Sequence, residues 1–185
     1  MSRTSSNMLP LGTKASDFTL FDTVSEKNLS LSDLKGEKAT VLFFICNHCP
    51  FVMHVNHEIV RIANKFQPKG VSFIAISSND ISNYPQDAPF FMQQVANDMK
   101  YPFPYLYDES QEVALQYDAA CTPDTYVFDA DLELVYRGQI DASRPENGIP
   151  ANGKDLRNAL HAILKGKEIK ADQKPSIGCN IKWKI

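Results

Sequence analysis

The sequence predicts a single α/β domain in which helices cover both faces of a mixed sheet. Residues 40–77 read as an apolar segment, an amphipathic segment and a second apolar segment, which is the pattern of two parallel strands joined by a crossover helix. Residues 126–128 and 132–139 flank the turn Asp129-Ala130-Asp131 and predict an antiparallel hairpin. The two patterns together predict a mixed central sheet inside a three-layer α/β/α sandwich.

The length of the chain sets its organisation. With 185 residues, 43% of them hydrophobic, the chain can bury one full core and is too short for two ordinary domains. We therefore expect one domain over residues 1–185. Residues 1–10 are polar and rich in serine, and we expect them to be flexible. Residues 166–185 contain Ile177, Ile181 and Trp183, so we expect this C-terminal tail to dock on the domain.

The first elements are short. Residues 18–20 and 29–31 alternate apolar and polar side chains around a Ser-Glu-Lys-Asn turn, which predicts an N-terminal β-hairpin extension. Residues 32–36 read as a capped helical turn that ends at Gly36. Residues 40–45 are apolar after Thr40, as expected for a strand that is covered on both faces.

The remaining elements follow from periodicity and from proline positions. Apolar residues recur at helical spacing from Val52 to Phe66, where a Gln-Pro-Lys-Gly sequence ends the predicted helix. Residues 71–77 form the second buried strand. Four prolines bracket a predicted helix over residues 88–99, and we expect the four aromatic residues of segment 101–107 to pack under the sheet edge. Residues 154–165 have one apolar face and predict the last helix.

Composition argues against several classes of function. Nineteen Lys and Arg residues against 22 Asp and Glu residues give a formal net charge of -3, and no basic cluster suggests a nucleic-acid partner. No apolar run approaches the length of a membrane span, and the N-terminus lacks the apolar core of a secretory signal. Four cysteines are too few for a disulfide scaffold, so we expect them to be chemically active thiols in a reducing, cytoplasmic compartment. We expect no cofactor and no membrane partner.

The segment Cys46-Asn47-His48-Cys49-Pro50 is the strongest functional signal. It lies where the first core strand passes into the long helix, and the N-terminus of a helix favours a thiolate. Two thiols at this spacing can cycle between a dithiol and a disulfide. A C-x-x-C pair is also half of a zinc site, but a second pair is missing from the sequence.

A zinc or structural module built from Cys46, Cys49, His54 and His57 is the third functional hypothesis. The two histidines share a helix face, yet Cys49 and His57 are eight residues apart, or about 12 Å along a helix. Zinc bonds of about 2.0 to 2.3 Å cannot bridge that separation. We therefore expect no metal site.

The chain resembles the thioredoxin fold in four features: the N-terminal hairpin, the 31–36 segment, the C-x-x-C pair and the later Thr122-Pro123. It is most similar to the peroxiredoxin-like (AhpC/TSA) branch, in a subgroup that keeps a C-x-x-C. The resemblance implies that Pro123 follows a cis bond and that Thr122 offers backbone groups to a bound disulfide. It departs from thioredoxin at Ile45 and Thr40, where thioredoxin has a tryptophan and a buried acid.

The resemblance and the thiol chemistry together predict a thiol-disulfide oxidoreductase. We expect Cys46 to be the more exposed thiolate, Cys49 to resolve the mixed disulfide, and His48 to stabilise the Cys46 thiolate, as the histidine of oxidising relatives does. The substrate would be a protein or a small molecule that carries a disulfide or a dithiol, with a separate reductant.

The alternative is a peroxiredoxin-like thiol peroxidase in which Cys49 is the peroxidatic cysteine. The resemblance then places Cys46 in the slot of an activating threonine and Pro123 in that of an arginine. Two of the three groups that organise a peroxide are therefore absent.

Cys121 and Cys179 stand outside the motif. Cys121 is two residues before Pro123, and the tail that holds Cys179 is long enough to return to the sheet edge. We expect these two to form a possible second redox pair, which requires Cα atoms within about 7 Å. Both could instead be small buried residues of the core.

Overall fold

The computed structural model describes residues 3–185, which form two sheets and five α-helices. The strands are β1 (Arg3–Ser5), β2 (Thr19–Asp22), β3 (Lys27–Ser30), β4 (Ala39–Phe44), β5 (Val71–Ser77), β6 (Tyr105–Tyr107), β7 (Cys121–Thr122), β8 (Asp124–Asp129), β9 (Leu134–Arg137) and β10 (Ile177–Asn180). The helices are α1 (Leu31–Leu34), α2 (Pro50–Phe66), α3 (Pro89–Asp98), α4 (Glu112–Gln116) and α5 (Lys154–Leu164).

The larger sheet has seven strands in the order β3-β2-β6-β5-β4-β8-β9. Strand β4 pairs in parallel with β5, and β5 pairs in parallel with β6, because helices cross over between them. Strand β8 runs antiparallel to both β4 and β9. The sheet is therefore mixed, which confirms the predicted fold class, and the N-terminal hairpin joins it through the pairing of β2 with β6.

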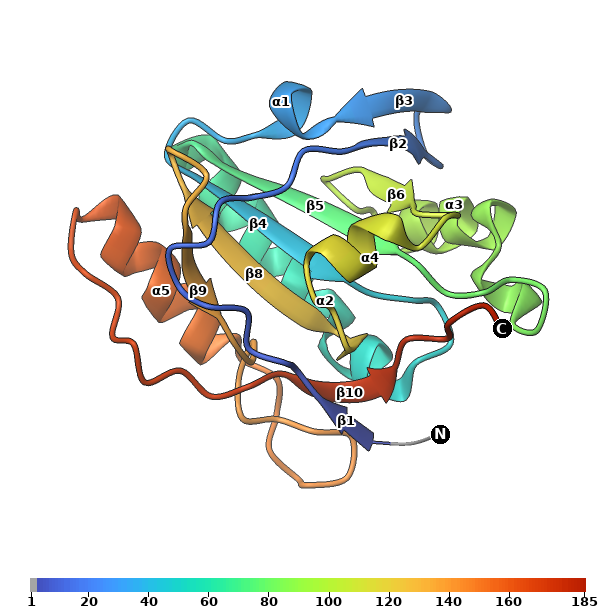
Figure 1. Ribbon diagram of the computed structural model, residues 1–185. Helices are drawn as coiled ribbons and strands as arrows, with labels where there is room; N and C mark the ends of the chain where they lie inside the picture. Colours follow the sequence, from blue (N-terminus) through green and yellow to red (C-terminus); the bar gives the residue numbers. More distant parts are fainter. Residues whose placement is uncertain (1–2) are drawn as a thin grey trace.

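Two hydrophobic cores lie on opposite faces of this sheet, since successive side chains of a strand point in opposite directions. Val41 and Phe43 of β4 pack in one core with residues of α2, α3 and α5. Leu42 and Phe44 pack in the other core with Leu31 of α1 and with residues of α4. Figure 1 shows α2 behind the sheet and α4 in front of it. This arrangement is the predicted three-layer sandwich.

A second, three-stranded sheet has the order β1-β10-β7 and joins both ends of the described chain to the segment before Pro123. Arg3 pairs with Cys179, and Cys179 pairs with Thr122, in antiparallel registers. In Figure 1, β1 and β10 lie side by side below the larger sheet. Residues 1–10 were expected to be flexible. That expectation is wrong for Arg3–Ser5, because the backbone groups of β1 pair with the tail strand.

The tail 166–185 lies along the domain. Its backbone bonds to three separate regions: Gln139 N–H donates to Lys174 O, Ile181 N–H donates to Ala120 O, and Asp80 N–H donates to Lys182 O. Ile181 is 1% exposed and packs in the same core as α4.

Two local expectations need correction. The aromatic segment 101–107 was expected to pack under the sheet edge, but Tyr105–Tyr107 form β6, an internal strand between β2 and β5. The first helical turn begins earlier than expected, because Ser30 is its N-cap and forms a capping box with Asp33.

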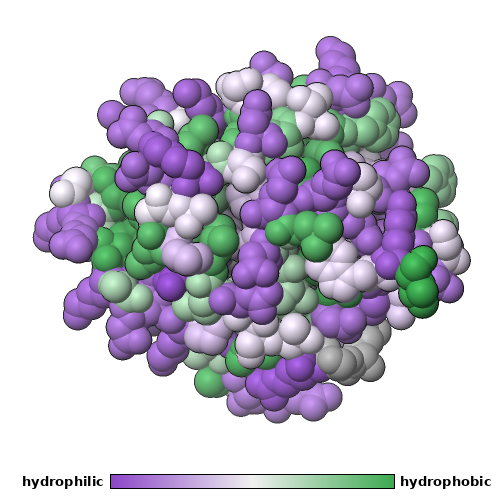
Figure 2. Space-filling view, in the orientation of Figure 1, coloured by the Kyte–Doolittle hydropathy of each residue, from purple (hydrophilic) through white to green (hydrophobic). Residues whose placement is uncertain are grey.

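The face of the molecule in Figure 2 mixes hydrophilic side chains with small hydrophobic areas. Within residues 3–185, none of the helices has the length and apolar character needed to cross a membrane.

Candidate redox site

The C-x-x-C segment lies between β4 and α2. Helix α2 begins at Pro50, so Cys49 is its N-cap residue, and Cys46 lies three residues earlier in the connecting loop. Proline at the first helical position loses no hydrogen bond, because that N–H would have no helical partner. Cys46 was expected at the helix start as the more exposed thiol, but it is Cys49 that occupies the helix start. Cys46 is 2% exposed and Cys49 is 0% exposed, and Cys49 holds the helix terminus.

Thr122 and Pro123 border both sulfurs. The Thr122–Pro123 peptide bond is cis, as the resemblance implied. Cys46 Sγ lies 3.5 Å from Thr122 Oγ1, and Cys49 Sγ lies 3.1 Å from the Thr122 carbonyl oxygen. The segment that was expected to offer backbone groups to a disulfide thus already contacts the two cysteines of the motif.

A third cysteine completes the cluster. Cys179 of β10 is 2% exposed, and its Sγ lies 2.6 Å from Cys49 Sγ. The possible redox pair of Cys121 and Cys179 does not fit this geometry, because the sulfur of Cys179 lies against that of Cys49. Cys179 pairs with Thr122 across the sheet, so these two side chains lie on the same face. Cys121 precedes Thr122 in β7, and its side chain therefore points to the opposite face. The Cys121 thiol instead lies 3.6 Å from the Pro123 carbonyl oxygen.

Hydrogen bonding inside the cluster separates the acidities of the thiols. Contacts from Cys179 and from Cys46 lower the pKa of Cys49, and the backbone N–H of Val52 adds to this effect. The same contact with Cys49 raises the pKa of Cys46 and of Cys179, and burial raises both pKa values further. Of the three thiols, Cys49 is therefore the favoured site of the thiolate.

Asp87 anchors the loop between the two cysteines. Its carboxylate is fully buried and accepts hydrogen bonds from Asn47 N–H at 2.8 Å, from His48 Nδ1 at 2.6 Å and from Asn79 Nδ2 at 2.8 Å. The negative charge of Asp87 also raises the pKa of Cys46, after the effects of Cys49 and of burial. Asp87 was missed in the sequence, because nothing near it in a proline-rich segment indicates which loop it will reach.

His48 lies in the loop as predicted but faces Asp87. Its ring stacks on Tyr84, with centroids 5.3 Å apart and an angle of 9° between the planes. Lys182 of the tail places Nζ 5.4 Å from the centre of the same Tyr84 ring. The histidine is thus fixed on one side by a carboxylate and on one face by an aromatic ring.

The structure does not bring together the proposed zinc ligands Cys46, Cys49, His54 and His57. Within residues 3–185, the group of potential ligands that does gather is Cys46, His48 and Asp87, whose ligand atoms lie within 4.8 Å of one another. Three hydrogen bonds already occupy the Asp87 carboxylate. The donor set is therefore better suited to orienting the loop than to binding a metal ion.

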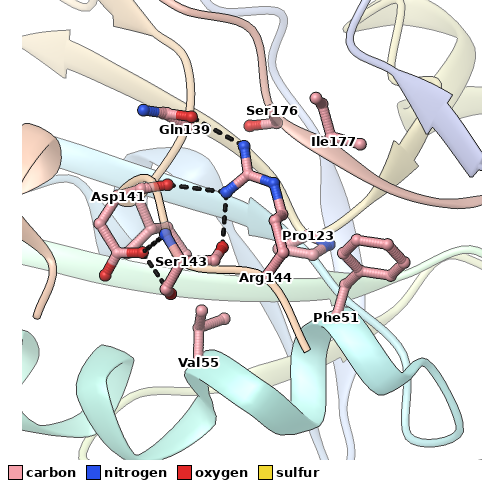
Figure 3. Close-up of a pocket in the computed structure, with 10 residues that line it drawn as sticks. Phe51, Val55, Pro123, Gln139, Asp141, Ser143, Arg144, Ser176 and Ile177 are labelled. Carbon is pink, nitrogen blue, oxygen red and sulfur yellow. Dashed lines mark hydrogen bonds between the residues drawn. The ribbon is translucent and has the colours of Figure 1, made fainter. Parts of the chain in front are cut away.

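A hollow beside Pro123 is crossed by Arg144 (Figure 3). Its guanidinium donates to Gln139 Oε1 at 2.7 Å, to Asp141 O at 2.8 Å and to Ser143 O at 2.6 Å. These three acceptors hold the guanidinium in place. Burial also lowers the pKa of Arg144.

Comparison with known proteins agrees with this geometry. The model of the AhpC/TSA family matches residues 11–137, which is more than half of the chain. No curated protein matches the sequence.

Two similar solved structures cover nearly the whole chain. An uncharacterized conserved protein from Geobacillus kaustophilus is 59% identical with a TM-score of 0.98, over 100% of this chain and 97% of that chain. A hypothetical protein from Sinorhizobium meliloti is 42% identical with a TM-score of 0.95, over 98% of each chain.

A more distant structure supports the fold alone. The peroxidoxin BcpB from Mycobacterium tuberculosis is 20% identical with a TM-score of 0.62, over 84% of this chain and 96% of that chain. The mixed sheet and the C-x-x-C loop against a cis-proline form a thioredoxin-like fold. With the family match they lead to one conclusion: the chain belongs to the AhpC/TSA family.

Proposed function

We propose that this protein is a thiol-disulfide oxidoreductase in which Cys46 and Cys49 alternate between a dithiol and a disulfide. The observation that carries the proposal is that both sulfurs lie beside Thr122, directly before the cis bond to Pro123, at the N-terminus of α2. Membership of the AhpC/TSA family supports a thiol redox function in general. A reducing compartment such as the cytoplasm fits the four thiols.

In the proposed cycle Cys49 is the attacking thiolate and Cys46 resolves the mixed disulfide. This is the reverse of the roles expected from the sequence. The Cys49 thiolate attacks one sulfur of a substrate disulfide, and the other substrate sulfur leaves as a thiolate. Cys46 then attacks Cys49, which releases the reduced substrate and forms the Cys46–Cys49 disulfide. An external thiol reductant restores the dithiol. The substrate would be a protein or a small molecule with a disulfide.

Access to the sulfurs requires movement. Cys46 and Cys49 are 2% and 0% exposed, so a substrate sulfur reaches Cys49 only after the loop or the tail has moved aside. Local opening of this kind costs less free energy than global unfolding. We expect small disulfides to react faster than folded protein disulfides for this reason.

A second candidate function is a thiol peroxidase, and the position and lowered pKa of Cys49 favour it. The Cys49 thiolate would attack a peroxide oxygen and become a sulfenic acid, while the O–O bond breaks and the other oxygen leaves as water or an alcohol. A neighbouring thiol would then condense with the sulfenic acid, releasing water and forming a disulfide. However, the resemblance places Cys46 and Pro123 at the positions where a peroxidase has threonine and arginine. Arg144 lies beside Pro123, but its guanidinium already donates hydrogen bonds to two carbonyl oxygens and one amide oxygen. Each missing preorganised donor lowers a rate about a hundredfold or more.

The test runs disulfide reduction and peroxide consumption side by side, with Cys49→Ser, Cys46→Ser and the matched control Cys121→Ser. We expect reduction of insulin and of a small aromatic disulfide to be lost in Cys49→Ser and kept in Cys121→Ser. Cys46→Ser should retain the attack by Cys49 and lose the Cys46–Cys49 disulfide. Undiminished reduction by Cys49→Ser would contradict the proposal. Rapid peroxide consumption that needs Cys49, with slow disulfide reduction, would favour the peroxidase.

A further inference from the structure

Cys49 and Cys179 are separated by 130 positions in the chain, yet their sulfurs are nearly in bonding contact. Their Sγ atoms lie 2.6 Å apart, whereas a disulfide bond is about 2.05 Å long. The sulfurs would need to approach by only about another half an ångström for a disulfide bond, which forms by oxidation or by exchange with an existing disulfide. Cys49 thus has two thiols within its reach, one from its own loop and one from the tail.

The second sheet holds Cys179 in this position. Cys179 lies between Arg3 of β1 and Thr122 of β7 in the ladder, and the preceding Gly178 allows this close approach. A Cβ atom at Gly178 would overlap the carbonyl group of Thr122 and would lie 3.1 Å from Pro123 N. Ser176, before the strand, donates from Oγ to Gly138 O at 2.8 Å. The tail thiol is therefore as well fixed as the thiols of the loop.

Cys179 also lines a surface hollow together with Arg3, Phe51 and Arg144. A thiol that enters this hollow meets Cys179 before it meets the rest of the cluster.

We propose that Cys179 is a third redox-active thiol that competes with Cys46 for the sulfur of Cys49. The inference rests on the proposed function, since it starts from the Cys46–Cys49 disulfide. The Cys179 thiolate attacks the sulfur of Cys49, the Cys49–Cys179 bond forms, and the Cys46–Cys49 bond breaks. Cys46 leaves as a thiolate and takes up the proton that Cys179 lost. The exchange has no net oxidation or reduction and needs no co-reactant.

The state of Cys49 controls when Cys179 can react. While Cys49 is a thiolate, its hydrogen bond with Cys179 raises the pKa of Cys179. That contribution disappears once Cys49 is in a disulfide, whereas burial still raises the pKa of Cys179 and the nearby positive charge of Lys182 lowers it. Formation of a disulfide at Cys49 therefore brings the pKa of Cys179 closer to its ordinary value. An external reductant in the hollow could then attack Cys179 and release Cys49.

The experiment maps disulfides in whole protein equilibrated in glutathione redox buffers, quenched with acid, alkylated and digested for mass spectrometry. In Cys46→Ser we expect an intramolecular Cys49–Cys179 disulfide as the main oxidised species, and the same product when Cys121→Ser is added. In the wild-type protein, we expect both the Cys46–Cys49 and the Cys49–Cys179 peptides. The wild-type measurement does not depend on the folding of any variant.

The possible failures can be told apart. If wild-type protein and Cys46→Ser both lack the Cys49–Cys179 peptide while the Cys46–Cys49 peptide and insulin reduction are present, the inference is overturned and the proposed function stands. If the Cys46–Cys49 peptide and disulfide reduction are both absent, the proposed function fails first. If Cys46→Ser instead links Cys49 to Cys121, the placement of Cys179 as the partner is refuted.

Discussion

Asp124→Asn should change how the stability of this protein depends on pH. Asp124 follows Pro123 directly and is fully buried, and its Oδ2 accepts from Ala120 N–H at 3.3 Å and from Tyr126 Oη–H at 3.2 Å. Burial raises the pKa of this carboxyl to about 6, although the hydrogen bonds act in the opposite direction. The pKa in the unfolded chain is close to the ordinary aspartate value of 3.8.

The folded state therefore binds the Asp124 proton more tightly than the unfolded state does. The resulting stabilisation is fully present below about pH 3.8 and is lost as the pH rises through about 6. A difference of about two pKa units corresponds to about 3 kcal/mol. Asparagine does not titrate, so Asp124→Asn does not undergo this loss. Between pH 4 and pH 7.5, the free energy of unfolding of the wild type should therefore fall by about 2 to 3 kcal/mol relative to that of Asp124→Asn.

Urea unfolding at several pH values between 4 and 7.5 measures this difference. The exposed Asp172 provides the control, because Asp172→Asn should follow the wild-type curve. If the curves of Asp124→Asn and of the wild type remain parallel across this range, the reasoning from burial to a raised pKa is refuted.

Three further predictions concern the redox cluster. Gly178→Ala should push β10 away from Thr122, cost about 1 to 3 kcal/mol of stability and remove the Cys49–Cys179 disulfide from the peptide map; an unchanged map would contradict it. Asp87→Ala leaves one buried and two partly buried donors without their acceptor, so the free energy of unfolding in urea should fall by about 3 kcal/mol or more. His48→Phe keeps an aromatic ring but removes the imidazole, and the Cys46–Cys49 couple should become more reducing by about 30 mV for each tenfold loss of thiolate stabilisation. Titration against glutathione measures this, and an unchanged or higher potential would show that His48 serves only as a spacer.

Local sequence patterns were sufficient to predict most strands of the larger sheet. The apolar segment before the cysteines became β4 with all six residues buried, because a strand covered on both faces leaves no residue exposed to solvent. The helix that follows ends at Phe66 as predicted, since a Gln-Pro-Lys-Gly sequence cannot continue it. The hairpin of β8 and β9 followed from a turn flanked by strand-forming residues.

The missed elements depend on contacts between distant segments. Strands β1, β7 and β10 have two to four residues each, too few for an alternating pattern to be visible, and they exist because they pair with one another. Strand β6 was missed since the four aromatic residues of segment 101–107 resemble a core cluster as much as a buried strand.

The same reason explains what the sequence revealed of the candidate site. The C-x-x-C loop and Pro123 carry recognisable local signatures. Asp87 and Cys179 have none, and they reach the loop from 40 and 130 positions away. Their roles depend on the register of a short sheet and on a loop that no periodic pattern describes.

Because β10 lies near the C-terminus and β7 does not, the cysteine cluster is completed only late in protein synthesis. A ribosome adds about 5 to 20 residues per second, so the 130 positions between Cys49 and Cys179 correspond to an interval of about 7 to 26 s. Throughout that interval, Cys46 and Cys49 exist in a chain that has no tail thiol. A nascent chain that meets an oxidant can therefore form the Cys46–Cys49 bond but not the Cys49–Cys179 bond, which belongs to the finished molecule alone.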